Sequence, residues 1–195
     1  MSVARKVIVV AAIASVFDGC ATSVGVSDYL RRTRAEILAD PPLQVLRTSK
    51  GNVVLAPESW GSRLLQPCSR SSLGQGGAYW VPTPREVELT QDALTQHFVS
   101  APPPSSLHEW PNLRSTNAQF VGVVRDGARS VYGSYMPKQR RDISWRQLPL
   151  SICDGGPAYF GVKVDLASSR VVSLEFDGCM CRSALANDSL ERSRD

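Results

Sequence analysis

The chain has 195 residues, of which 43% are hydrophobic and 21% charged, so it falls in the ordinary globular range and is long enough to bury one core. Its formal net charge of +4 is too small to indicate a nucleic acid partner. Short basic runs at 31–34 and 140–141 are typical of a solvated surface.

The first predicted element is an export signal. Arg5 and Lys6 precede an uncharged run from Val7 to Phe17. This run has the length of a signal-peptide apolar region and is shorter than the roughly 20 residues that span a bilayer as a helix. A buried first strand or helix is the alternative interpretation, but the basic start and the Gly-Cys exit favour export.

The end of this segment, Val16-Phe17-Asp18-Gly19-Cys20, resembles the lipobox of bacterial lipoproteins. The resemblance implies that residues 1–19 are a signal peptide, that the Cys20 thiol receives a diacylglyceryl group, and that the lipid anchors the chain to a bacterial membrane, with its globular part in the periplasm. Ala21 is not the aspartate that retains some lipoproteins at the inner membrane, which favours the outer membrane. Ordinary signal peptidase cleavage after Ala21 is the alternative, and it also exports the chain.

The cysteine count agrees with a lipid at Cys20. Assigning one of the five cysteines to lipid leaves Cys68, Cys153, Cys179 and Cys181 as an even set, which an oxidising periplasm permits to form two disulfides. One residue separates Cys179 from Cys181, and so small a ring strains a disulfide. We therefore expect each of these two to pair with Cys68 or Cys153. Four thiolates could instead hold zinc, but the spacing lacks two paired knuckles, so we expect no metal and no cofactor.

Residues 20–27 are small and polar and are predicted to form a tether. Asp28 can cap a helix over 29–39, which Pro41 and Pro42 would end. Residues 45–55 are predicted to be extended on both sides of a turn at "SKGN". The composition of residues 66–77 predicts a loop.

The clearest helix prediction runs from Thr83 or Pro84 to Val99. Thr83 can cap this helix, Pro84 suits its first position, and Glu86 supplies the second half of a capping box. The apolar face at helical spacing consists of Val87, Leu94 and Phe98, with Thr90 or Gln91 between them.

The second half of the chain predicts strands. Residues 118–124 and 129–136 flank Asp126-Gly127, which is a strong hairpin signal, and residues 158–166 and 170–178 predict a second hairpin. Residues 148–153 are a further candidate strand. The predicted fold is α+β, with one or two helices packed on a twisted antiparallel sheet of four to five strands, in a single domain over 28–182 followed by a polar tail over 183–195.

Two segments of this domain carry a further resemblance. Residues 150–178, together with residues 79–88, "YWVPTPREVE", are similar to segments of uncharacterised exported proteins of proteobacteria. This resemblance implies a periplasmic domain and transfers no site.

No catalytic residue is predicted. His97 and His108 are the histidines available as general bases, and the hydrolase motifs and phosphate-binding loops with a recognisable spacing are absent from the sequence. The best candidate for a binding loop contains Asp154, Gly155, Gly156 and Tyr159, although Asp-Gly-Gly-Pro is also typical of a turn between strands. The aromatic residues that could serve either as anchors for a partner or as core are Tyr132, Tyr135, Trp145, Tyr159 and Phe160.

These observations favour an envelope lipoprotein whose periplasmic domain binds or inhibits another protein, through a sheet face or a loop rim. One version is an immunity-type inhibitor of a cell-wall toxin. The alternatives are an envelope enzyme with a site around His108 or Asp154, and a structural component of an envelope or secretion complex.

Overall fold

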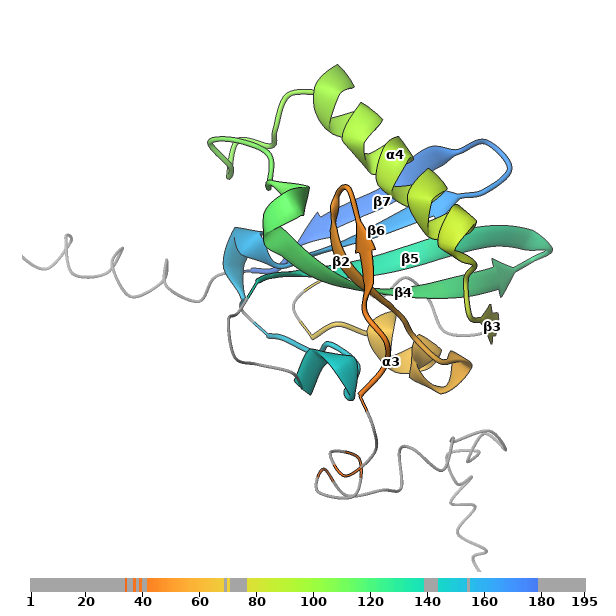
Figure 1. Cartoon of the computed structure of the whole chain (residues 1–195). Coiled ribbons are helices and arrows are strands. Elements are labelled where there is room, and N and C mark those ends of the chain that lie inside the picture. The colour runs from red at the N-terminus through yellow and green to blue at the C-terminus, as the bar shows by residue number, and fades with distance from the viewer. Residues whose placement is uncertain are drawn as a thin grey trace, which may run out of the picture. The chain divides into compact units, whose positions relative to one another are not determined.

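A computed structural model of the chain describes residues 42–68, 77–138, 144–153 and 155–178, together with Arg34, Ile37, Ala39 and Arg70 (Figure 1). The elements in chain order are β1 (Leu46–Thr48), β2 (Gly51–Leu55), the 3-10 helix η1 (Glu58–Trp60), α3 (Gly61–Leu64), β3 (Ala78–Trp80), α4 (Pro84–Ser100), η2 (Leu113–Ser115), β4 (Thr116–Arg125), β5 (Ala128–Pro137), η3 (Ser144–Arg146), η4 (Gly156–Ala158), β6 (Phe160–Asp165) and β7 (Arg170–Phe176).

The fold is α+β, as the sequence predicts, but the sheet is larger than expected. Seven strands form one open sheet in the order β1-β2-β4-β5-β6-β7, and β3 pairs with β4 beside this path. The pairing of β2 with β4 is parallel, whereas every other pair is antiparallel. A parallel pair needs a crossover connection. Here that connection contains η1, α3, β3, α4 and η2.

Helix α4 forms as predicted, and its start is fixed by a complete capping box. The Thr83 hydroxyl accepts a hydrogen bond from the Glu86 N–H at 3.2 Å, and the Glu86 carboxylate accepts one from the Thr83 N–H at 2.8 Å. Pro84 occupies the first turn, where a missing N–H costs nothing. The helix ends at Ser100, and "PPP" follows one residue later.

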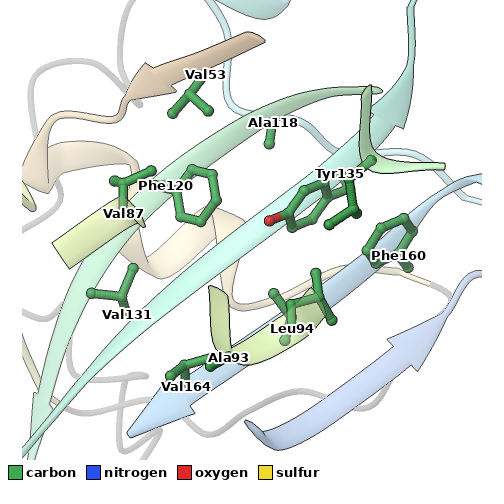
Figure 2. Packing of buried hydrophobic residues seen from close by; sticks show 12 residues of the cluster. Val53, Val87, Ala93, Leu94, Ala118, Phe120, Val131, Tyr135, Phe160 and Val164 are labelled. Carbon is green, nitrogen blue, oxygen red and sulfur yellow. The ribbon is translucent and has the colours of Figure 1, made fainter. Parts of the chain in front are cut away.

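The main core lies between α4 and one face of the sheet. Because side chains alternate along a strand, every second residue of β4, β5 and β6 points toward α4. Figure 2 shows Ala93 and Leu94 of α4 packed against these residues. The Tyr135 ring stacks on Phe160 with centroids 4.5 Å apart and meets the edge of Phe120 at 5.6 Å.

The opposite face of the sheet is also covered, by α3, η1 and the segment around η3 (Figure 1). The buried residues on this side include Trp60, Leu64, Leu65, Val121, Tyr132 and Trp145. The sheet is therefore a middle layer, with a long helix on one face and short helices and loops on the other.

Both predicted hairpins are present. In the β4–β5 hairpin Asp126 and Gly127 have φ values of 50° and 77°, as a two-residue turn with two positive φ angles requires. The β6–β7 hairpin turns through Ser169, which has φ 53°. The turn that separates β1 from β2 at residues 49–50 is also as predicted.

The prediction of a strand over 148–153 is wrong. The backbone of this segment bonds to a side chain instead of a neighbouring strand. The buried Gln119 amide donates to the carbonyls of Trp145 and Leu148, and its oxygen accepts from the Leu150 N–H at 2.6 Å. Elements η1, α3 and β3 were not predicted, because three or four residues are too few to show a period.

Several predictions lie outside the described residues. They are the export signal, Cys20 and the tether, most of the helix over 29–39, and the polar tail. Arg34 and Ile37 of the predicted helix are described and are helical.

Candidate functional site

A disulfide joins Cys68 to Cys153, across 85 residues of sequence. This corrects the expectation that each of these cysteines pairs with Cys179 or Cys181, which lie outside the described residues. The reason is spatial, because the loop after α3 and the loop before η4 lie together and bring the two Cα atoms to 5.3 Å. Both cysteines are exposed at the surface.

A charged cluster lies buried two residues beyond this disulfide. The Arg70 Nε is 2.7 Å from Asp177 Oδ1, and the two side chains are 2% and 0% exposed. The Arg70 guanidinium also donates to the Tyr132 hydroxyl at 3.0 Å and to the Ser134 hydroxyl at 3.4 Å. Three segments therefore meet at Arg70: the loop after α3, β5 and the end of β7.

The cluster depends on a glycine and changes the chemistry of a tyrosine. A Cβ atom at Gly161 of β6 would stand 2.2 Å from both Arg70 Nη1 and the Tyr132 hydroxyl, so only glycine leaves room for the guanidinium. Burial raises the pKa of Tyr132 to about 12. The positive charge of Arg70 acts against this shift, and the negative charge of Asp177 adds to it. Tyr132 is therefore a neutral hydrogen-bond partner inside a buried cluster.

The predicted binding loop lies beside the cluster. Asp154 is outside the described residues, whereas Gly155, Gly156 and Tyr159 are described. The Gly156 N–H donates to the Gly178 carbonyl at 3.1 Å, and the Asp177 N–H donates to the Tyr159 carbonyl at 2.9 Å. These bonds continue the pairing of β6 with β7, so the loop acts as the brace that holds the end of β7.

The two histidines lie in different surroundings. His108 is exposed in the loop that follows α4. His97 lies in the last turn of α4, where its ring meets the edge of Trp110 at a centroid distance of 5.9 Å. Trp110 in turn stacks on Phe98 at 4.4 Å and donates its indole N–H to the Ala101 carbonyl at 3.0 Å.

His97 and Trp110 form one wall of a surface groove, which we call the β7 groove. Its volume is about 330 Å³, and its other residues are Pro104 and most of β7, including Val172 and Leu174. The groove is mainly apolar, and its aromatic wall is fixed by the stacking of Trp110. No sequence pattern indicated it, because its two sides are about 60 to 80 residues apart in the sequence.

Strand β7 forms an edge of the sheet. It pairs with β6 on one side, and within the described part of the chain no strand pairs with its other side. A register shift opposite Lys163 and Val164 leaves Val172 as the extra residue of a β-bulge, and Val172 is 56% exposed. An apolar side chain that lines the β7 groove thus stands on this strand edge.

The aromatic residues that could anchor a partner divide by burial into four core residues and one that is partly exposed. Tyr132, Tyr135, Trp145 and Phe160 are buried and belong to the two cores. Burial also raises the pKa of the Tyr135 hydroxyl above its ordinary range. Tyr159 is partly exposed.

Among the residues that the structure describes, no group of three or more His, Cys, Asp or Glu side chains gathers as a metal site would require. None of the described helices is long and apolar enough to cross a membrane. Comparisons of the chain with protein-family profiles, with curated proteins and with solved structures found no match.

Proposed function

We propose that the chain is a protein-binding domain of the bacterial cell envelope, exported and anchored through a lipid on Cys20, that takes an extended segment of a partner protein along β7. The observation that carries this proposal is the open edge of β7 beside the β7 groove. An immunity-type inhibitor of a cell-wall toxin is one such protein.

The unpaired edge of β7 favours an extended peptide as the ligand. A strand edge presents a row of backbone N–H and C=O groups, and an extended peptide pairs with such a row by strand addition. Side chains on alternate positions of the added strand would point toward α4 and enter the groove between Trp110 and Leu174. An apolar residue suits that position, because the wall is aromatic and aliphatic.

The other open strands are weaker candidates. In the described part of the chain β1 and β3 also pair on one side only, but each has three residues, whereas β7 has seven, so β7 offers more than twice the pairing length. The exposed Cys68–Cys153 disulfide supports an oxidising compartment, where such bonds persist.

The chain offers a matched pair of positions for testing the interface. Val172 and Val99 are both exposed valines, at 56% and 85%, but Val172 lies on the groove and Val99 does not line it. A photocrosslinking phenylalanine analogue placed at Val172, in cells that export the chain, is expected to trap a discrete partner protein. The same analogue at Val99 is expected to trap it at least about tenfold less. Equal crosslinking yields at Val172 and Val99 would show that β7 is not part of the interface.

The anchor is tested separately. The wild-type chain is expected in the membrane fraction with an acylated N-terminus that begins at Cys20, and a Cys20→Ala chain is expected in the soluble fraction. If both chains are equally membrane bound, lipid attachment at Cys20 is wrong, although binding at β7 could still hold.

A further inference from the structure

An exposed disulfide stands next to a buried ion pair in this structure. Cys68 and Cys153 are accessible to solvent, but Arg70, two residues along the chain, has a side chain that is only 2% exposed. A small thiol can therefore reach the bond without unfolding the protein, while the charges that the bond holds in place are out of reach.

Both ends of the disulfide lead to the ion pair. On one side Cys68 fixes the loop that inserts Arg70 beneath the sheet. On the other side Cys153 begins the loop whose Gly156 and Tyr159 bond to the backbone at Gly178 and Asp177. The disulfide thus joins the segment that carries Arg70 to the segment that holds Asp177 in place.

The ion pair has little stability of its own. Removing two charges from water is unfavourable, and the attraction between them offsets this cost only while their geometry is held. In the described residues, the attachments that hold Arg70 to the sheet are the disulfide and the bonds of its own guanidinium. Without the disulfide, the loop regains its conformational entropy and both charges regain their hydration.

We propose that the Cys68–Cys153 disulfide is a thiol-operated latch on the buried Arg70–Asp177 ion pair. When it is oxidised, Arg70 is held against Asp177 and Tyr132. When it is reduced, Arg70 leaves the sheet and water reaches the Tyr132 face, while the core under α4 stays folded. The inference is independent of a partner at β7.

The switching reaction needs a dithiol as co-reactant. One thiolate of the dithiol attacks one sulfur of the disulfide, so that the Cys68–Cys153 bond breaks and a mixed disulfide forms. The second thiolate then displaces the protein sulfur. Two electrons and two protons pass to the protein, which ends with two thiols, and the dithiol ends as a cyclic disulfide.

Hydrogen exchange measured by mass spectrometry tests the release, with dithiothreitol as the dithiol. On reduction, amide exchange in residues 155–159 and 177–178, which brace Asp177, is expected to accelerate by about tenfold or more, while exchange in α4 and in the middle of β5 changes by less than about threefold. The Cys68→Ser/Cys153→Ser double variant is the control, and dithiothreitol is expected to leave its exchange unchanged. Loss of protection in α4 to the same degree, or a response of the control variant, would overturn the latch.

A double-mutant cycle tests the coupling. In the oxidised protein, Arg70→Met removes the Arg70 charge from the buried Asp177 carboxylate and is expected to raise the unfolding equilibrium constant by roughly 100-fold or more. In the double-serine background, where Arg70 has already left the sheet, the same change is expected to have less than about a threefold effect. Equal effects in the two backgrounds would show that the disulfide does not hold the ion pair. Should the double-serine chain fail to fold, the dithiothreitol-reduced wild-type and Arg70→Met chains supply the same comparison.

Discussion

Replacing Glu86 with glutamine is expected to lower the free energy of unfolding by about 1 kcal/mol at neutral pH and to remove part of the acid sensitivity of the domain. Glu86 links three elements at the start of α4. Its carboxylate accepts from the Thr83 N–H and from the Trp80 indole at 3.4 Å, and it lies 2.9 Å from the guanidinium of Arg129 on β5. The same guanidinium stacks over the Trp80 ring at 4.5 Å.

The magnitude follows from what glutamine keeps and what it loses. Its amide oxygen can still accept from Thr83, so the capping box survives. It loses the charge that faces Arg129, a pair in which the arginine is 56% exposed and which is therefore worth about 0.2–1 kcal/mol. It also loses the favourable position of an anion at a helix N-terminus, worth about 0.3–1 kcal/mol.

The pH dependence gives the sharper test. Burial alone would raise the pKa of Glu86, but the bonds from Thr83 and Trp80 and the charge of Arg129 together hold it below its usual range. Because the folded pKa is the lower one, the stabilisation is fully present above the unfolded pKa of about 4.3 and is lost as pH falls through the folded value. The difference between wild type and Glu86→Gln is therefore constant from about pH 7 to about pH 5 and shrinks below that.

Urea denaturation at low ionic strength, repeated in steps of pH, measures this difference. Glu88→Gln is the matched control. Glu88 lies one half turn further along α4 and is 57% exposed, and its partner Arg85 is 72% exposed, so a change within about 0.5 kcal/mol is expected. A difference that is absent at pH 7, or that persists undiminished in acid, would refute the reasoning.

Two further substitutions probe the side of the sheet opposite α4. Gly161→Ala places a methyl group against the Arg70 guanidinium, and we expect a loss of about 1–3 kcal/mol in urea denaturation, whereas Gly178→Ala, which meets nothing within 4 Å, is expected to be nearly neutral. Equal effects of the two alanines would contradict the close approach. Gln119→Leu removes three hydrogen bonds to the segment over 145–150, two of them buried, and is expected to cost about 3 kcal/mol, with faster hydrogen exchange in that segment as the second readout. An unchanged exchange rate there would show that Gln119 does not hold the segment.

The parts of the fold that the sequence predicts correctly depend on neighbours in the chain. The capping box needs Thr83 and Glu86, three residues apart, and the β4–β5 turn needs Asp126 next to Gly127. Residues 148–153 show the limit of such patterns. An apolar run fits a strand, but the buried amide of Gln119, about 30 residues earlier, takes the backbone bonds that a strand would use.

The candidate sites were less predictable than the fold. The β7 groove joins Trp110 to Val172, and the ion pair joins Arg70 to Asp177, and neither pair shows a spacing that a sequence pattern could reveal. A partial signal existed for Arg70, since an arginine two residues from a bridged cysteine is held close to the protein. Its partner could not be named, because any acidic residue near the end of a strand fits equally well.

The sequence by itself determined the α+β class, the limits of α4 and the two hairpins, since helix capping, apolar periodicity and turn conformation are interactions over a few residues. Only the tertiary structure decided that β2 pairs in parallel with β4, that Cys68 meets Cys153, and that Arg70 lies beneath β5. These contacts join residues 62 to 85 positions apart in the sequence. Many other pairings of these residues would be possible in an isolated segment. The packing of both faces of one sheet selects the observed ones, and that packing depends on the whole chain.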